Sequence, residues 1–145
     1  MKKLKKSTDP TTTTIPVALA VTRVKRWLQI LAAMPDFEKK HDSIPRAIFI
    51  SFDDIKQLQA DYPPDTLKGI RLYFGVAGED QPMPASVEDL RGMIVPVLKS
   101  PTGRFIDLIE SDEANPNDTS VYDFTSPCPK YCDVNSELYV PYPAE

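Results

Sequence analysis

The sequence predicts an α+β fold: an antiparallel sheet of three to five strands, with an N-terminal amphipathic helix and a second short helix on one face. Three observations lead to this prediction. Apolar residues recur at helical spacing in 16–33, alternate with polar residues in 69–78, and flank a turn with proline and glycine within 92–109. The chain has 145 residues, 41% of them hydrophobic, which suits one domain with its own core.

The first helix is predicted over residues 16–33. Pro16 is compatible with a first helical turn, and Thr14 is a candidate cap in front of it. Trp27 belongs to the apolar stripe of this helix and is expected in the core. The whole stripe, at i, i+3 and i+4 spacing, comprises Val17, Ala20, Val21, Val24, Trp27, Leu28 and Leu31.

A strand and a second helix follow. Residues 46–50 are rich in β-branched and aromatic side chains, which is typical of a strand. Ser51 is the expected N-cap of a helix over 52–61, and Asp54, three residues on, makes an acidic variant of the capping box.

The clearest strand is predicted over residues 69–78, where apolar and polar side chains alternate. Such alternation indicates a strand with one buried face, as antiparallel sheets usually have. The apolar face comprises Ile70, Leu72, Phe74 and Val76.

A hairpin is predicted next, from a strand at 92–98 to a strand at 104–109. Because Pro96 cannot donate a hydrogen bond to a neighbouring strand, the first of these strands is expected to be an edge strand or to carry a bulge. Further short strands are expected at 121–124 and 138–140.

The ends of the chain differ from its middle in composition. Residues 1–14 have almost nothing to bury and are predicted to be a disordered leader, and residues 15–145 to form a single α+β domain. From about residue 111 this domain is expected to be acidic and rich in proline and cysteine. Residues 1–50 hold ten Lys/Arg against four Asp/Glu, whereas residues 107–145 hold one lysine and nine acidic residues. The fifteen prolines favour loops that are ordered in advance.

Composition also restricts the location and the partners. No stretch approaches the ~20 apolar residues of a membrane span. Polar residues separate the N-terminal lysines from a short apolar run, unlike the pattern of a signal peptide. We therefore expect a cytoplasmic protein that does not bind membranes. The isoelectric point near 5.0 and the lack of a basic stripe with interleaved aromatic residues argue against nucleic-acid binding.

The two cysteines, Cys128 and Cys132, stand at C-x₃-C spacing in a proline-rich stretch. The spacing fits half of a zinc site, but zinc takes four ligands and the chain can add only His41 or carboxylates. A disulfide would close a short ring, contribute at most about 2 kcal/mol, and be reduced in a cytoplasm. We favour a stiff turn with two reduced, buried cysteines. Zinc is the alternative, and no other cofactor is expected.

No catalytic constellation is visible in the sequence, and we name no catalytic residue. His41, the only histidine, lies among charged residues and is expected in a solvated loop. Adjacent carboxylate pairs could support acid–base chemistry only where the fold brings them together. Arg71 and Tyr73, on the polar face of the strand 69–78, are the candidate ligand contacts.

Several motifs resemble a group of small, uncharacterised bacterial proteins. In order along the chain, they are AIFISFDDIKQLQ, GIRLYFG, MIVPV and VYDFTSPCPKYCD, and the similarity covers roughly residues 44–133. The matching positions are Gly69, Arg71, Tyr73, Gly75, Asp123, Cys128, Pro129 and Cys132. The resemblance implies a strand–helix start and a Pro-Cys-rich end in a bacterial protein, and it implies no particular activity.

These observations favour a non-catalytic interaction or accessory module whose partner is another protein or a second copy of the chain. One alternative is a protein that binds a small ligand or a metal through the turn of Cys128 and Cys132. Another is a small carboxylate-based enzyme in which Arg71 and Tyr73 contact the substrate.

Overall fold

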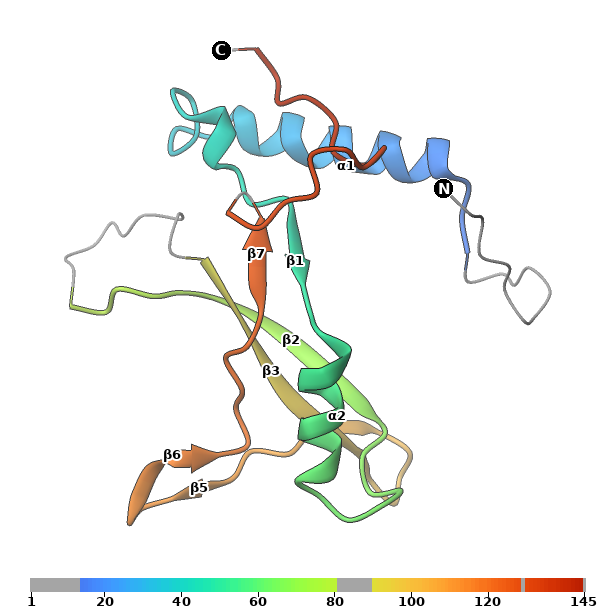
Figure 1. The fold of residues 1–145 in the computed structure, drawn as a ribbon, viewed down its shortest axis with the longest axis vertical. Helices are drawn as coiled ribbons and strands as arrows, with labels where there is room; N and C mark the ends of the chain where they lie inside the picture. Colours follow the sequence, from blue (N-terminus) through green and yellow to red (C-terminus); the bar gives the residue numbers. More distant parts are fainter. Residues whose placement is uncertain (1–13, 81–89, 129, 145) are drawn as a thin grey trace. The chain divides into compact units, whose positions relative to one another are not determined.

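The computed structural model describes residues 14–80, 90–128 and 130–144 (Figure 1). As predicted, it combines helices with antiparallel sheets in an α+β fold. The predicted leader lies outside the described residues, apart from Thr14. The elements in chain order are α1 (Val17–Ala32), a short 3₁₀ helix (His41–Ser43), β1 (Ala47–Phe49), α2 (Phe52–Ala60), β2 (Gly69–Val76), β3 (Leu90–Lys99), β4 (Phe105–Asp107), β5 (Ser111–Asp112), β6 (Asn115–Thr119) and β7 (Ser126–Cys128).

The chain divides into two compact units. The first comprises Met1–His41 together with Asp133–Glu145, and the second comprises Asp42–Cys132. The first unit therefore contains α1 and the C-terminal segment, and the second contains the strands β1 to β7.

In the first unit, α1 confirms the predicted N-terminal helix, but its buried stripe is narrow. Only Leu28 and Leu31 of the helix are buried. Trp27, which was expected in the core, is 47% exposed, and Ile30 is 58% exposed. The i, i+3 and i+4 pattern marks a broad apolar side, and only its central part, at Leu28 and Leu31, is buried.

The C-terminal segment of the first unit corrects two predictions. Val140 is buried, but residues 138–140 form no strand: a turn runs into them, closed by a hydrogen bond of 2.9 Å from the amide of Tyr139 to the carbonyl of Ser136. His41 is not in a solvated loop either. It is 8% exposed, and its Nδ1 donates to the carbonyl of Pro143 over 2.6 Å. A backbone carbonyl can only accept, so this bond places a proton on Nδ1.

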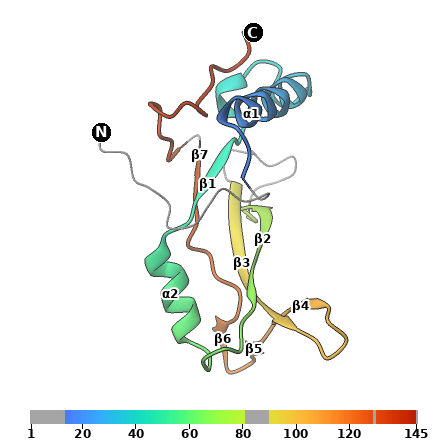
Figure 2. The ribbon, with the colours of Figure 1, turned by 90° about the vertical axis from the view of Figure 1, so that its right-hand side faces the viewer.

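The second unit is built on an antiparallel sheet of order β2-β3-β4. The predicted hairpin is confirmed, since Lys99 pairs with Phe105 across a turn in which Gly103 adopts a φ of 87°. Glycine suits this turn because other residues are strained at such a φ. In Figure 2, β4 extends the sheet beyond the β2–β3 hairpin.

The expectation for Pro96 is wrong, because β3 lies in the middle of the sheet and pairs with β2 without a bulge. The carbonyl of Pro96 accepts from the amide of Leu108 over 2.9 Å. In an antiparallel pair the reciprocal bond would run from residue 96 to the carbonyl of Leu108, and proline has no hydrogen to donate. The buried hydroxyl of Ser120 donates to that carbonyl instead, over 2.7 Å.

Beyond β4, the same edge of β3 is continued by the segment that leads into β7. Ile94 and Tyr122 form a bridge, with hydrogen bonds of 2.8 Å in both directions. Farther along, the hydroxyl of Thr125 accepts from the amide of Gly92 over 3.0 Å and donates to its carbonyl over 2.9 Å. Of the strand predicted over 121–124, only the bridge at Tyr122 forms.

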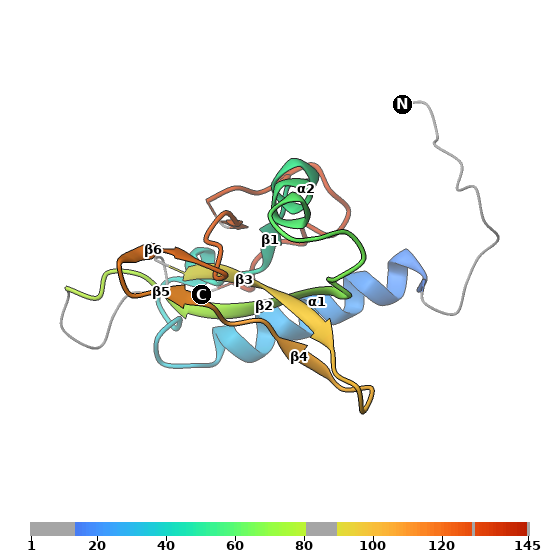
Figure 3. The ribbon, with the colours of Figure 1, turned by 90° about the horizontal axis from the view of Figure 1, so that it is seen from below.

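Gly92 allows a close approach at the centre of this unit. A Cβ atom at this position would lie 2.6 Å from Leu72 Cδ1 and 2.9 Å from Thr125 Oγ1. It would also lie 3.1 Å from Ile48 Cδ1, so β1 covers the same side of the sheet as the Leu72 side chain. Figure 3 shows α2 over this side too, and its Leu58 is fully buried.

The strand–helix start of the second unit is confirmed with one change. β1 pairs with β7 in an antiparallel ladder, and α2 begins after Ser51. The Ser51 hydroxyl accepts from the amide of Asp53 over 3.1 Å, so it caps the helix. The capping box would have used the amide of Asp54 instead.

Candidate functional site

The predicted ligand contacts, Arg71 and Tyr73, lie side by side along the polar face of β2, and both are bound to Asp107. The Arg71 guanidinium makes an ion pair with this carboxylate, and the Tyr73 hydroxyl donates to its other oxygen. Arg71 also donates to the carbonyl of Phe105 over 3.5 Å. Asp107 belongs to β4, two strands away from β2.

This polar cluster spans the central strand. Arg71 pairs with Val95 of β3, and Asp107 pairs with Val97. Paired residues share a face, so the cluster and the two valines lie on the same side of the sheet. Both valines are buried, at 3% and 5% exposure. The cluster has a clear structural role, since it ties β2 to β4 over an apolar strand. Asp107 was not singled out from the sequence, because only the strand order brings it here.

The opposite, apolar face of β2 was expected to be buried, but most of it is exposed. Phe74 is 71% exposed, and Ile70 and Val76 are about two-fifths exposed. Leu72 alone reaches the interior, where it lies over Gly92. The strand is longer than the elements that cover this face, so its apolar side chains extend beyond the core.

The outer edge of β2 is unpaired: among the described residues, this strand pairs only with β3. The direction of its backbone groups follows from Ile94, whose amide and carbonyl both bind Tyr122 on the far side of β3. Leu72, the partner of Ile94 in the register, therefore directs its own amide and carbonyl to the outer edge. By alternation, Ile70, Phe74 and Val76 do the same. The same four residues thus present free backbone groups and apolar side chains.

A cleft of about 630 Å³ opens between the residues that follow α2 and the strands β5 and β6. This volume is within the range of small-ligand sites. Asp61 and Tyr122 lie within it, and the Tyr122 hydroxyl donates to the Asp61 carboxylate over 2.6 Å. The lining residues are Asp61, Tyr62, Glu110, Ser111, Asp112, Asn117, Asp118, Thr119 and Tyr122.

The lining gives the cleft a negative potential. Four of its side chains are carboxylates, and among the described residues no lysine, arginine or histidine lines it. Burial, followed by the hydrogen bond to Asp61, raises the pKa of Tyr122 well above its ordinary value. Such a cleft disfavours phosphates and other anions, and its carboxylates attract cations. It was missed in the sequence because β5 and β6, which form one wall, lie in a stretch that lacks strand-forming residues.

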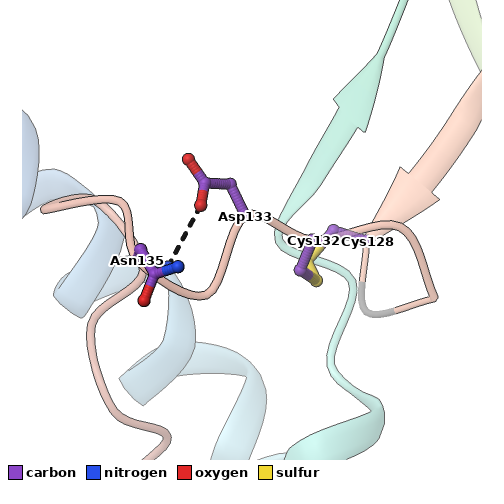
Figure 4. The surroundings of a disulfide bond; sticks show 4 residues. All are labelled: Cys128, Cys132, Asp133 and Asn135. Carbon is purple, nitrogen blue, oxygen red and sulfur yellow. Dashed lines mark hydrogen bonds between the residues drawn. A yellow bond between two sulfur atoms is a disulfide. The ribbon is translucent and has the colours of Figure 1, made fainter. Parts of the chain in front are cut away.

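The predicted cysteine site differs from the favoured interpretation. Cys128 is buried, as expected, but Cys128 and Cys132 are joined in a disulfide, with Cα atoms 4.9 Å apart (Figure 4). Because disulfide sulfurs are not thiolates, a zinc site here requires prior reduction. The next residues form a local turn, in which the Asp133 carboxylate accepts from the amide of Asn135 over 3.1 Å.

Two further properties concern metals and membranes. Within residues 14–80, 90–128 and 130–144, no three or more histidine, cysteine or acidic side chains gather in a way that could hold a metal ion. None of the helices in this part of the chain is both long and apolar enough to cross a membrane. No protein-family model, curated protein or solved structure matches the chain.

Proposed function

We propose that this chain is a non-catalytic binding module that accepts an extended strand of a partner protein at the outer edge of β2. The observation that carries the proposal is the coincidence, on this one strand, of unpaired backbone groups with exposed apolar side chains. An unpaired edge is a template for another strand. Partners that bind in this way gain affinity from main-chain hydrogen bonds and specificity from alternate side chains.

The side chains around the edge define the chemistry of the partner strand. Phe74, Ile70 and Val76 offer apolar contacts on one face, so the partner needs apolar residues at every second position. On the other face, Arg71 and Tyr73 are already bound to Asp107 and present a fixed polar surface. The partner's intervening residues are therefore polar.

The alternatives have less support. A substrate that used Arg71 and Tyr73 would have to displace the bonds of both to Asp107. A metal bound through Cys128 and Cys132 would require reduction of their disulfide. Strand addition at β2 requires no such rearrangement.

The test uses a synthetic peptide of alternating valine and threonine, with one lysine at each end for solubility. Amide hydrogen exchange is measured residue by residue by NMR, with and without the peptide. We expect slower exchange for Leu72, Phe74 and Val76, whose amides face the outer edge. The amides of Arg71 and Tyr73 face β3 and should change little.

A control peptide with proline in place of the central valine should bind at least tenfold more weakly, because that valine directs its amide at β2 and proline has no hydrogen to donate. In a sample that sedimentation shows to be monomeric, unchanged exchange along β2 at millimolar peptide, or protection confined to residues outside β2, would refute the proposed function.

A further inference from the structure

We infer that the strand which pairs with β2 is the β2 strand of a second copy of this chain. This inference rests on the proposed function and identifies its partner. Two copies would be related by a twofold axis, and their three-stranded sheets would join into one continuous antiparallel sheet. Three features of β2 point to a second copy: the backbone register, the side chains that the register brings together, and the charges at the strand ends.

The register follows from the outward-facing residues. Ile70, Leu72, Phe74 and Val76 direct their backbone groups to the edge, and their positions are symmetric about Tyr73. A twofold axis through Tyr73 therefore pairs Ile70 with Val76 of the second copy, and Leu72 with Phe74 of the second copy. Every outward amide and carbonyl then meets a complementary group. A shift by two residues leaves some of them without a partner.

The same register matches the side chains. On the apolar face, Ile70 meets Val76 and Leu72 meets Phe74, so the exposed side chains of each copy cover those of the other. On the polar face, Arg71 lies opposite Gly75 of the second copy, so the two guanidinium groups do not face one another. A one-residue slip would place apolar side chains against polar ones.

Charge at the two ends of the strand selects an antiparallel second copy. Exposed Lys68 precedes β2, whereas exposed Glu79 and Asp80 follow it. Antiparallel pairing about the twofold axis brings Lys68 of each copy to the acidic end of the other. Opposite charges thus meet at both ends of the paired strands, whereas parallel pairing would bring like charges together.

Two charge-reversal variants test this arrangement: K68E and E79K/D80K. All three positions are exposed, so the variants should fold like the wild type, as checked by circular dichroism. The dimerisation constant is measured by sedimentation velocity at low salt. Each variant alone should dimerise about tenfold more weakly than the wild type, since attraction becomes repulsion at both ends. An equimolar mixture should form a heterodimer at wild-type strength, because both ends then match again.

A second pair of variants tests the apolar face. Phe74→Lys should abolish the dimer, because lysine on an edge strand opposes pairing. Phe105→Lys is the matched control: Phe105 is 59% exposed on β4, outside the β2 edge, and its replacement should leave the dimer intact.

The outcomes separate the inference from the proposed function. A wild-type chain that stays monomeric at millimolar concentration overturns the inference, as does a dimer that is unaffected by Phe74→Lys. If the valine–threonine peptide still protects the outward amides in that case, strand addition stands and the partner is another protein. If neither pairing occurs, both proposals fall.

Discussion

Replacing Ser120 by alanine removes a single oxygen atom, but it should destabilise the second unit by more than so small a change implies. Its hydroxyl donates to the carbonyl of Leu108 over 2.7 Å and accepts from the amide of Glu110 over 2.8 Å. Ser120 is 1% exposed, so water cannot replace it without rearrangement. A buried carbonyl without a partner costs about 1–3 kcal/mol, and the second lost bond adds about 0.5–1.5 kcal/mol. Because Glu110 is exposed and its amide can bind water, we expect a loss of about 2–3 kcal/mol.

The assay is native-state hydrogen exchange of the slowest amides in β3, which reports the opening of this unit by itself. A loss of that size corresponds to exchange about 30- to 150-fold faster. Ser111→Ala, an exposed serine of β5, is the control and should change the free energy of opening by less than about 0.5 kcal/mol.

A double-mutant cycle with Pro96→Ala isolates the cause. Alanine at position 96 restores an N–H that can bind the carbonyl of Leu108, so Ser120→Ala should cost at least about 1 kcal/mol less in this background. The cost of the cavity left by Pro96 cancels in the cycle. An equal cost of Ser120→Ala in both backgrounds would refute the reasoning that Ser120 replaces the missing N–H of proline.

Three further predictions concern the other sites. Asp107→Asn should lower the free energy of unfolding of the second unit by about 0.5–1 kcal/mol, because it removes the ion pair with Arg71. The loss should be smaller in 1 M salt, because salt screens an ion pair with a half-exposed arginine. Asp118→Asn is the control, and an unchanged urea midpoint of Asp107→Asn would contradict the prediction. Tyr122 has a raised pKa in the folded state, so its contribution to stability is present below pH 10 and is lost as the pH rises further. Between pH 9 and pH 11, Tyr122→Phe should therefore lose less stability than the wild type, and parallel pH profiles would refute the assignment. After denaturation, the intact mass of the chain should be two hydrogens lower than expected for two free thiols, because Cys128 and Cys132 form a disulfide. Reduction of this disulfide should lower the free energy of unfolding by at most about 2 kcal/mol.

The local elements were predictable because their signals are local. The alternation in residues 69–78, the cap at Ser51 and the turn at Gly103 each specify structure within a few residues, and each agrees with the fold. Pro96 shows where such reasoning stops. Its missing donor predicted an edge strand, but the fold supplies a substitute from Ser120, which is 24 positions farther along the chain.

The candidate site was predictable only in part, since it depends on strand order. Arg71 and Tyr73 were assigned correctly to the polar face of a strand, but their partner Asp107 follows from the β2-β3-β4 order. The exposure of Phe74 also depends on tertiary structure: alternation predicts which side chains share a face, and the extent of the covering elements decides whether that face is buried.

The two sides of the β2–β3 hairpin differ in how far their backbone groups are hydrogen-bonded, and this difference supports a role for the open side. Along the outer side of β3, the bridge at Tyr122 and the hydroxyl of Thr125 satisfy backbone groups that β4 does not reach. The hydroxyl of Ser120 satisfies the carbonyl of Leu108, which Pro96 cannot bind. Along β2, none of the described residues provides such closure. Edge strands in monomeric proteins are usually protected by charged side chains, prolines or bulges, and β2 has no proline or bulge and directs its only charged residue, Arg71, into the bond with Asp107. This difference between the two sides supports the proposal that a partner strand is added along β2.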